Sequence, residues 1–331
     1  MDELAAIQQL LASARRALVA THIMPDGDAI ASALGLAWAL RRKGLEARLA
    51  CEDPVPAELR FLPGSADFAP RTRTDEDVII AVDCGDLSRL GKVYQAEAFA
   101  GVPLVNIDHH GTNPHFGTVN WVETRSSTAE LVLELVRFLG IPLDLPIATC
   151  LLTGILTDTR GFRTASTTAE TLHAAMTLVA AGAPLAQIAD AVFNRRPLEA
   201  LRLWGTALTT ARHEDGILWV PISREMLRAL GATDAAVSGL ANFLSTFDHT
   251  LVYVVLHELA DGQVDVNLRS RPEVNVAAVA QALGGGGHPQ AAGCLLPGPL
   301  ERAEELVLGA LRSALRQGKA IQQDSAQKDG A

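Results

Sequence analysis

The chain has 331 residues, of which 48% are hydrophobic and 20% are charged, and its formal net charge is −10. This is the composition of a globular protein, and the length predicts two domains. The sequence contains no run of about 18 uncharged apolar residues, which argues against a membrane span. It also lacks the basic stripe of proteins that coat long nucleic acid, so we expect any nucleic-acid substrate to be short and not a duplex.

The N-terminal stretch and the cysteines both bear on where the protein works. Residues 1–20 lack the basic start and apolar centre of a signal peptide and are typical of an amphipathic helix. The four cysteines lie far apart and form no CxxC pair: Cys51, Cys84, Cys150 and Cys294. This spacing argues against a zinc–thiolate site and a disulfide framework, and it favours a reducing cytoplasm.

Strand-like and helix-like segments alternate in the first half of the chain. Apolar runs typical of strands occur at 17–22, 47–52, 77–84 and 103–110, and helical patterns occur at 29–44, 126–140, 146–158 and 167–182. This alternation predicts an α/β domain with a doubly wound, mostly parallel sheet. Ser127 and Glu130 have the spacing of a capping box at the start of one of these helices.

The pattern changes at the polar, proline-interrupted stretch 194–205, which we interpret as part of a link between domains. Beyond it, Asp261-Gly262 joins two β-rich runs within 250–271 and predicts a hairpin, and a short helical pattern at 275–284 leads into "GGGGHPQAAG". The polar end of the chain predicts disorder. We therefore expect a first domain at 1–190, a linker at 191–215, a smaller α/β domain at 216–318 and a disordered tail at 319–331.

Charged side chains gather where the predicted strands of the first domain end. His22, Asp26 and Asp28 follow the first strand, Asp83 ends the third, Asp108, His109 and His110 end the fourth, and Asp158 closes the helix 146–158. In open α/β sheets this edge is where ligands bind. So many carboxylates would repel one another unless divalent cations lay among them. Oxygen and nitrogen ligands without thiolate suit Mn²⁺ or Mg²⁺ and are compatible with Zn²⁺, Fe²⁺ or Co²⁺.

Two further features suggest phosphate chemistry. Two metal ions about 3.5–4 Å apart activate water and clamp phosphoryl oxygens, and Asp83 suits the role of shared ligand because it ends a central strand between the other clusters. The glycine run before His288 lets backbone N–H groups approach an anion closely. It is not a Walker loop, because no Lys-Ser/Thr pair follows. The four tryptophans are scattered and predict no stacking platform.

The motifs also carry a family resemblance. In chain order, "HIMPDGDAIAS", "VDCGD", "NIDHHGTN" and "TGILTDTRGF" resemble the four motifs of the DHH phosphoesterases. "GGGGHPQAAG" is similar to the signature of the associated C-terminal domain called DHHA1. The resemblance covers about residues 10 to 315. It implies a DHH domain followed by a DHHA1 domain, with the active site in a cleft between them.

The resemblance implies a role for each motif residue. The metal ligands would be His22 and Asp26 on one ion and Asp28, His109 and Asp158 on the other, with Asp83 bridging. The catalytic residues would be Asp83, His110 on the scissile phosphate and Asp108 orienting the histidines. A terminal phosphate would be bound by Arg269, Gly285, Gly286, Gly287 and His288, and Arg163 is a further substrate-binding candidate. Arg160 and Thr164 depart from the small residue and the aromatic that we expect in the fourth motif, which bears on base recognition.

Short chains of this type most resemble the bacterial oligoribonuclease (nanoRNase) and adenosine 3′,5′-bisphosphate phosphatase group. The implied substrates are short single-stranded RNA or DNA oligonucleotides and a nucleoside bisphosphate. The implied cofactors are two divalent cations, Mn²⁺ before Mg²⁺ or Co²⁺. The DHHA1 domain would act as a ruler, because gripping one phosphate lets only short substrates place another at the metals. No membrane partner is expected, and the sequence leaves open whether the chain forms a homodimer.

Four other functions remain open at this stage. A phosphodiesterase for linear or cyclic dinucleotides would use the same residues. A family II inorganic pyrophosphatase shares the metal motifs, but that group carries a different C-terminal domain. A RecJ-type single-strand exonuclease is disfavoured by the short, acidic chain without an OB-like domain. A non-catalytic nucleotide sensor should lack at least one ligand, and none is missing here.

Overall fold

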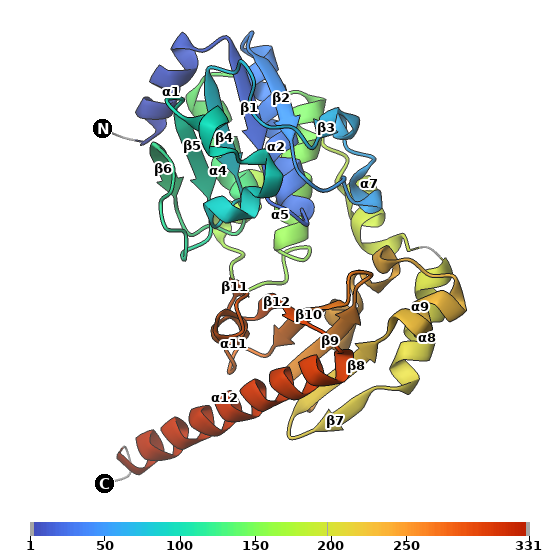
Figure 1. Ribbon diagram of the computed structural model, residues 1–331. Coiled ribbons are helices and arrows are strands. Elements are labelled where there is room, and N and C mark those ends of the chain that lie inside the picture. Colours follow the sequence, from blue (N-terminus) through green and yellow to red (C-terminus); the bar gives the residue numbers. More distant parts are fainter. Residues whose placement is uncertain (1–2, 197, 329–331) are drawn as a thin grey trace. The chain divides into compact units, whose positions relative to one another are not determined.

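The computed structural model describes residues 3–196 and 198–328 of the chain (Figure 1). The chain divides into two compact units, Met1–Arg195 and Arg196–Ala331, and each is described by itself.

A six-stranded sheet forms the centre of the first unit, and every pair of neighbouring strands in it is parallel. Its order is β3-β2-β1-β4-β5-β6, with bounds β1 Arg16–Ala20, β2 Glu46–Ala50, β3 Phe68–Ala69, β4 Val78–Val82, β5 Leu104–Asp108 and β6 Val119–Val122. This confirms the predicted doubly wound parallel sheet. The short edge strands β3 and β6 were not predicted, because two and four residues carry too little periodicity.

Both faces of this sheet are covered. Along β1, Ala17 and Val19 belong to one apolar core, whereas Leu18 and Ala20 belong to another on the opposite face. The longer helices cover the first face and short elements the second (Figure 1). These elements are α1 Glu3–Ser13, α2 Gly27–Arg42, α4 Thr128–Phe138, α5 Leu145–Asp158, α6 Ala169–Ala180 and α7 Leu185–Ala189 on one side, and η3 Leu87–Val93 and α3 Ala96–Phe99 on the other.

The strand order places a crevice between β1 and β4, because the chain winds to one side from β1 and to the other from β4. The 3₁₀ turns η1 Ala57–Leu59 and η2 Ser65–Asp67 lie between β2 and β3, and the π-helix η4 Asp190–Asn194 ends the unit. The helix predicted over 1–20 is too long. It ends at Ser13, and β1 begins at Arg16 because the apolar residues that follow pair with β2 and β4.

None of the helices in the described part of the chain has both the length and the apolar composition of a membrane span. The pair Ala169–Ala180 and Leu185–Asn194 reaches that length and composition together, across a bend of 114°.

The second unit holds another six-stranded sheet, in the order β11-β12-β10-β9-β8-β7. All its neighbours are antiparallel except β8 and β9. Its strands are β7 Arg212–Glu214, β8 Ile217–Ile222, β9 Val252–Glu258, β10 Gln263–Ser270, β11 Gly286–His288 and β12 Ala291–Pro297. The predicted hairpin joins β9 to β10, with Gly262 at φ +82° in the left-handed region.

Helices cover both faces of this second sheet as well. One core includes residues of α11 and α12, and the other includes residues of α8, α9, η5 and α10. Their bounds are α8 Leu198–Thr209, α9 Arg224–Leu230, η5 Asp234–Val237, α10 Leu240–Leu244, α11 Val276–Ala282 and α12 Leu300–Lys328.

Two predicted boundaries differ from the structure. Most of the segment 191–215 is not a linker, because α8 and β7 are regular elements of the second unit. Ala200, Leu203 and Ala207 are buried at helical spacing, a signal obscured by the polar residues around them. Helix α12 continues to Lys328, through most of the segment 319–331 for which we expected disorder, and residues 329–331 lie outside the described part.

The close packing of α2 on α5 yields a stability prediction. A Cβ added at Gly35 would lie 2.8 Å from Leu151 Cγ in the buried interface between these helices. Overpacking of this kind costs about 1–3 kcal/mol, more than the roughly 1 kcal/mol that alanine gains over glycine inside a helix. We therefore expect Gly35→Ala to lower the urea midpoint of unfolding, followed by circular dichroism.

The matched control is Gly205→Ala in α8, where an added Cβ meets nothing within 4 Å. This change should raise the midpoint slightly, because only the helix-propensity gain remains. A Gly35→Ala protein that is as stable as the wild type would contradict the close approach of the two helices.

Candidate metal centre

The candidate centre lies at the carboxyl ends of β1 and β4, where the strand order reverses. Thr21 donates its hydroxyl to the Val82 carbonyl at 3.0 Å, which ties the loop after β1 to the end of β4. Asp26 then caps α2, because its Oδ1 accepts from the Ala29 N–H at 3.1 Å. Asp28 follows in the first turn of α2 and is fully buried. The loop between strand and helix therefore delivers several charged side chains to the crevice at once.

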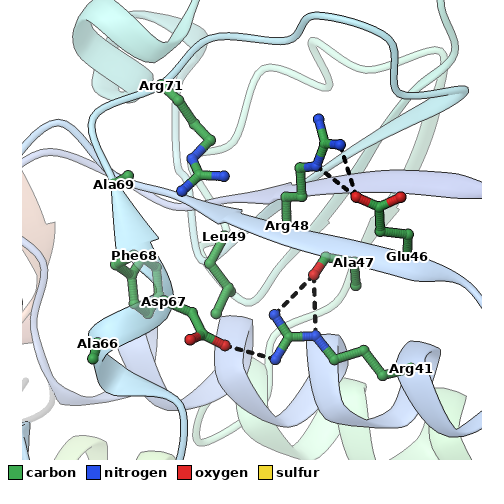
Figure 2. A pocket seen from close by; sticks show the side chains of 10 residues that line it. All are labelled: Arg41, Glu46, Ala47, Arg48, Leu49, Ala66, Asp67, Phe68, Ala69 and Arg71. Atoms are coloured by element: carbon green, nitrogen blue, oxygen red, sulfur yellow. Dashed lines mark hydrogen bonds and ion pairs between the residues drawn. The ribbon is translucent and has the colours of Figure 1, made fainter.

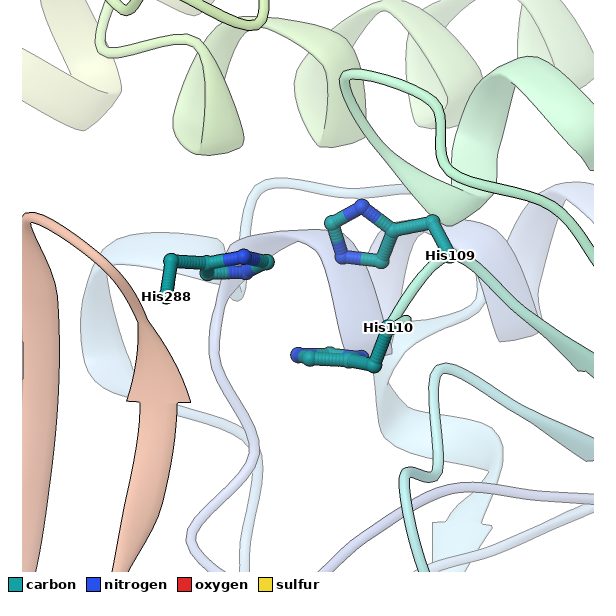
Figure 3. A group of neighbouring side chains, drawn as sticks. All are labelled: His109, His110 and His288. Atoms are coloured by element: carbon teal, nitrogen blue, oxygen red, sulfur yellow. The ribbon is translucent and has the colours of Figure 1, made fainter. Parts of the chain in front are cut away.

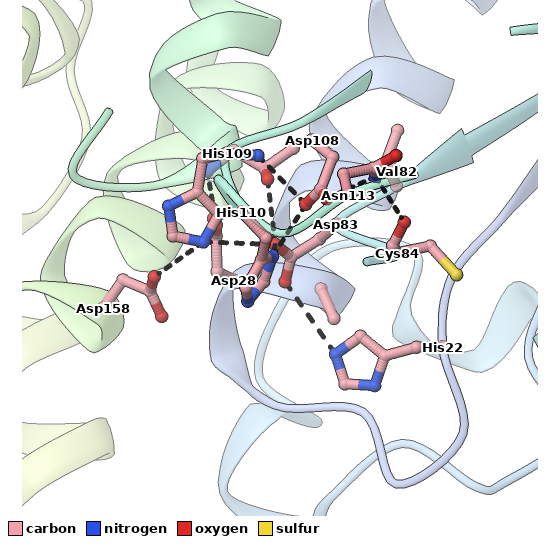
Figure 4. Close-up of polar contacts among 12 residues, drawn as sticks. His22, Asp28, Val82, Asp83, Cys84, Asp108, His109, His110, Asn113 and Asp158 are labelled. Carbon is pink, nitrogen blue, oxygen red and sulfur yellow. Dashed lines mark hydrogen bonds and ion pairs between the residues drawn. The ribbon is translucent and has the colours of Figure 1, made fainter. Parts of the chain in front are cut away.

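Asp83 occupies the middle of the centre (Figure 4). Its Oδ2 lies 3.9 Å from His22 Nε2, and its Oδ1 lies 3.5 Å from His109 Nε2. The backbone of Asp83 is in the left-handed region, at φ +54°. Non-glycine residues adopt this conformation mainly where the surroundings demand it, so the turn that aims this carboxylate into the crevice is strained.

Three groups of possible ligand atoms share Asp83, and two of them hold the predicted metal ligands, whereas the third joins Asp83 to Asp108 and His110. In each group the atoms lie within 4.8 Å of one another: His22, Asp26 and Asp83 form the first, and Asp28, Asp83 and His109 the second. Asp158, at the end of α5, joins the second group, because its Oδ2 lies 3.3 Å from His109 Nε2. The structure thus brings together all six residues for which metal binding was predicted.

Asp28 makes contacts that the sequence did not predict. Its Oδ2 accepts from the Thr128 N–H at 2.6 Å and its Oδ1 from the Ala129 N–H at 3.1 Å, so it caps α4 from a distance of 100 residues along the chain. The predicted capping box is wrong: the Ser127 side chain makes no capping bond, and Glu130 accepts from Ser126 instead. The side chain of Asp28 accepts from two backbone N–H groups at once, one on each oxygen, which a single hydroxyl oxygen at Ser127 would not do in this way.

Close packing leaves Asp28 little freedom. Ser32 also donates to its Oδ1, at 3.0 Å. A Cβ at Gly154 would lie 2.7 Å from the Ala129 Cβ and would also press on Asp28 Oδ1. Only a glycine on α5 allows the carboxylate to sit between α2, α4 and α5.

The carboxylates of the centre repel one another, and burial together with this repulsion shifts their pKa values. Burial, followed by the charges of Asp83 and Asp26, raises the pKa of Asp28 well above its usual value. Burial and the charge of Asp28 do the same to the pKa of Asp158. Burial and the charge of Asp26 raise the pKa of Asp83, although the neighbouring histidines act against this rise. For Asp26, burial acts to raise the pKa, but the charge of His22 and the Ala29 N–H outweigh it, and the pKa is lowered.

This donor set suits divalent cations. Carboxylate oxygens and imidazole nitrogens without thiolate are ligands for hard or borderline ions, and positive charge would relieve the repulsion that raises the pKa values. The histidines are oriented for this role. His22 Nδ1 lies 2.7 Å from the Ile23 carbonyl and 2.9 Å from Arg89 Nη2, and His109 Nδ1 lies 3.2 Å from the Arg125 carbonyl. Each ring therefore turns Nε2 toward Asp83, as backbone partners of metal-binding histidines commonly arrange.

A second layer of hydrogen bonds holds His110. Its Nδ1 donates to Asp108 Oδ1 at 2.8 Å, and the other oxygen of Asp108 accepts from Asn113 Nδ2 at 2.6 Å. Burial acts to lower the pKa of His110, but this hydrogen bond and the charge of Asp83 outweigh it and raise the pKa to about 9. Figure 3 shows His110 beside His109. Their ring centroids lie 4.5 Å apart in an edge-on arrangement.

Sequence reasoning missed three residues that support the centre. Asn113 holds Asp108 and donates to the Cys84 carbonyl at 3.1 Å. Thr128 donates its hydroxyl to Asp83 Oδ1 at 2.8 Å, and Arg89 contacts His22. Asn113 lies within the third motif, and its position beside the histidines was a usable signal. Thr128 and Arg89 carry no such signal, because only the fold brings them to Asp83 and His22.

The phosphate-binding candidates of the second unit line up across three strands. Strand register pairs Arg269 on β10 with Ala291 on β12, and Ala291 with His288 on β11. Directly opposed residues point to the same face, so Arg269 and His288 flank a small alanine on one face of the sheet. Of the glycines expected to form a loop, Gly286 and Gly287 belong instead to β11, and Gly285 precedes it.

One substrate-binding candidate, Arg163, and one hollow of the first unit lie outside the Asp/His cluster. Arg163 is exposed, and its Nε donates to the Arg160 carbonyl at 2.7 Å. A separate hollow, with a volume of about 550 Å³, lies beside β2 and the segment 66–69. Figure 2 shows the side chains that line it. There Arg41 pairs with Asp67 at 2.8 Å and Arg48 with Glu46 at 2.7 Å. The described residues that line it include no predicted site residue.

The shifted pKa values predict how metal-free protein responds to pH. A group whose pKa is raised by folding adds stability below its unfolded value and loses it as the pH rises through its folded value. Asp28, Asp83 and Asp158 have raised values, and His110 is raised to about 9. We therefore expect the melting temperature of the chelated protein to fall between pH 6 and pH 8.5, measured by differential scanning fluorimetry.

The control is the same protein loaded with Mn²⁺. Its melting temperature should stay higher and change less over this range, because the cation compensates the carboxylates. Other titrating groups behave alike in both samples, so the difference isolates the centre. A chelated protein that becomes more stable than the loaded protein as the pH rises would contradict this account of the charges.

Comparison with known proteins agrees with the fold and the site. The description "DHH family, N-terminal domain" matches residues 16–155, and "DHHA1 domain" matches residues 223–317. A Thermus thermophilus protein named bifunctional oligoribonuclease and PAP phosphatase NrnA is 39% identical over 306 residues, which cover 90% of this chain and 89% of that protein. A Geobacillus thermodenitrificans protein named cyclic-di-AMP phosphodiesterase GdpP is 26% identical over 345 residues, which cover 96% of this chain and 50% of that protein.

A solved structure shares the architecture. The crystal structure of an exopolyphosphatase-related protein from Bacteroides fragilis superposes with a TM-score of 0.87 at 25% identity, covering 96% of this chain and 97% of that chain. The family predicted from the motifs is thereby confirmed. The chain belongs to the DHH family of phosphoesterases, with an N-terminal DHH domain followed by a DHHA1 domain.

Proposed function

We propose that the protein hydrolyses short oligoribonucleotides and converts adenosine 3′,5′-bisphosphate to AMP and phosphate. The observation that carries this proposal is the Asp83 carboxylate, which is common to two adjacent groups of ligand atoms. This arrangement suits the two-metal hydrolysis of phosphate esters. The substrate class rests on the Thermus thermophilus relative, whose name states both activities and whose identity of 39% extends over 90% of this chain.

The ligand assignment follows the two groups. His22 and Asp26 would hold one divalent cation, Asp28, His109 and Asp158 would hold the other, and Asp83 would be shared by both. We propose Mn²⁺ as the ion, with Mg²⁺ or Co²⁺ as alternatives, because the ligands are oxygen and nitrogen atoms. Bound there, the cations would lower the pKa of a water molecule and neutralise phosphoryl oxygens.

The protein's own side chains hold and orient the phosphate. Asp108 accepts the proton on Nδ1 of His110, and this hydrogen bond favours the protonated form of the ring. Held in this way, His110 would present Nε2 as a donor to a phosphoryl oxygen, where negative charge develops during the reaction. Asn113 fixes Asp108, and Thr128 fixes Asp83, so neither carboxylate needs to reorient when the substrate binds.

The second unit would select for short substrates. Arg269 and His288 flank Ala291 on one sheet face, which suits a terminal phosphate between two cationic or donor side chains. The backbone of Gly285–Gly287 and the exposed Arg163 are further contacts that we propose for the substrate. Four free cysteines, all buried, suit a reducing cytoplasm.

A phosphodiesterase acting on linear or cyclic dinucleotides is the second candidate. It is favoured by the match to the Geobacillus thermodenitrificans relative, of which this chain covers only half. The same metal ligands would serve both reactions. A family II inorganic pyrophosphatase is disfavoured by the DHHA1 match at residues 223–317.

A substrate panel tests the proposal. Purified Mn²⁺-loaded protein is given adenosine 3′,5′-bisphosphate, linear and cyclic di-adenylate, pyrophosphate, and RNA from two to about 24 nucleotides. The longest of these RNAs exceeds the length that a single nucleic-acid-binding domain usually covers. We expect fast release of product from the bisphosphate and from two- to five-mers, fading with length. Exclusive hydrolysis of pyrophosphate, or efficient degradation of the longest strands, would overturn the proposal.

The variant Asp83→Ala separates an enzyme from a nucleotide sensor. Removing the shared ligand should reduce turnover of every substrate to the level of the blank, because both groups lose a carboxylate. Asp67→Ala is the matched control, since Asp67 lies in the hollow of Figure 2 and pairs with Arg41. Retained turnover in Asp83→Ala would remove Asp83 from the mechanism.

A further inference from the structure

Three aromatic side chains of the second unit form a continuous row. The Trp204 ring on α8 lies 5.5 Å from the Phe243 ring on α10, centroid to centroid, and Phe243 lies 5.5 Å from Phe247. Aromatic residues make up only 5% of the chain, so such a row is unusual in it. No stacking platform was predicted from the scattered tryptophans, because Trp204 comes from a different segment than Phe243 and Phe247.

The Phe243 and Phe247 rings lie outside the buried cores of the second unit. Phe243 is 38% exposed and Phe247 is 46% exposed, whereas Leu240 and Leu244 on the same helix are buried. Trp204 is fixed behind them, because its indole N–H donates to the Ala236 carbonyl at 2.9 Å. Adjacent exposed aromatic rings on a rigid support are a feature of binding sites more than of solvent-facing surface.

Two arginines at the end of β10 contact the segment that carries Phe243 and Phe247. Asn242, the neighbour of Phe243, accepts from Arg269 Nε at 2.7 Å. The Phe247 carbonyl accepts from Arg271 Nη2 at 3.1 Å. Arg269 thus contacts the residue next to Phe243, and Arg271 contacts the backbone of Phe247. Arg269 is one of the side chains that we have proposed as phosphate contacts. Cationic groups interleaved with aromatic faces are the pattern by which proteins hold single-stranded nucleic acid.

We propose that Phe243, with Phe247 packed edge-on beside it, forms a nucleobase platform: a base of the substrate stacks on the face of the Phe243 ring while Arg269 binds its phosphate. This inference rests on the proposed function and deepens it. Stacking accepts every base, because every base has a π-face, so the platform would distinguish nucleotides from base-free phosphates without selecting a sequence. It would supply base recognition within the second unit, separately from Arg160 and Thr164 of the fourth motif.

The charge around the row supports a nucleotide in preference to an apolar partner. Arg271 lies 6.0 Å from the centroid of the Tyr253 ring, and the Arg196 guanidinium lies 4.8 Å from the centroid of the Trp204 ring. Arg196 thus lies over the Trp204 ring of the row. Arg271 contacts the Phe247 backbone and pairs with Asp248 at 3.4 Å, and Arg269 contacts Asn242. An apolar protein partner would have to cover these cations, whereas the phosphates of a nucleotide would neutralise them.

The test compares ligands with and without bases. The inactive background Asp83→Asn is titrated calorimetrically with the dinucleotide pApA and with its abasic counterpart, in the presence of Mn²⁺. Phe243→Leu in this background keeps apolar volume but removes the π-face. We expect it to weaken binding of pApA about tenfold, within the range that stacking on an aromatic side chain supplies, and to leave binding of the abasic ligand unchanged.

Two further variants sharpen the comparison. Phe243→Trp should restore binding of pApA, because it restores an aromatic face. Phe138→Leu is the matched control, since Phe138 is 42% exposed on the first unit and should change neither affinity. In otherwise active protein, Phe243→Leu should raise KM for pApA about tenfold while kcat stays within about twofold.

The outcomes separate this inference from the proposed function. Equal weakening of both ligands by Phe243→Leu, or no weakening of either, overturns the platform. If the wild-type protein hydrolyses no nucleotide, the proposed function fails, yet the titration still decides whether a base stacks on Phe243. If turnover occurs and the titration shows no dependence on the base, the function stands and the platform does not.

Discussion

The crowding of negative charge around Asp83 is the constraint on which the rest of the first unit depends. A buried carboxylate is costly, and here several share one crevice, with burial and mutual repulsion raising the pKa values of Asp28, Asp83 and Asp158. Fixed hydrogen-bond donors offset part of this cost. Backbone N–H groups of α4 donate to Asp28, and the Thr128 hydroxyl donates to Asp83. The charge that these donors do not neutralise is what divalent cations would take up, so the same groups that destabilise the metal-free protein would bind the ions.

Asp28 couples this centre to the architecture. It is a candidate ligand and also the N-terminal cap of α4, so the position of a whole helix depends on the carboxylate that would hold a metal ion. Metal binding and folding therefore share part of their free energy in this unit. The side chain that caps α4 is thus 100 residues away in the sequence and not a neighbour of the helix. The geometry of the centre therefore depends on the packing of the whole unit and not on any single loop.

Much of the fold and site could be predicted because parallel sheets follow strict rules. Side chains that end β1, β4 and β5 must meet at one edge, so His22, Asp83 and His109 could be grouped from strand positions alone. What could not be predicted depends on contacts between distant segments. The cap of α4 looked like a Ser127–Glu130 box because propensity is local, and the Trp204–Phe243–Phe247 row is visible only once α8 and α10 are packed. The expected linker was a helix whose small buried residues gave a weak apolar signal.

The distribution of the candidate residues along the chain has a consequence for biosynthesis. All six proposed metal ligands lie between His22 and Asp158, within the first unit, whereas Arg269, His288 and the aromatic row lie in the second. A ribosome delivers the chain from its N-terminus, and domains fold largely in that order. Under the proposed assignments, the hydrolytic centre can form and take up ions while the selecting unit is still being translated. The nascent protein would then be able to hydrolyse phosphate esters before it could select short substrates. The interval between the two would be set by the time needed to translate the second unit.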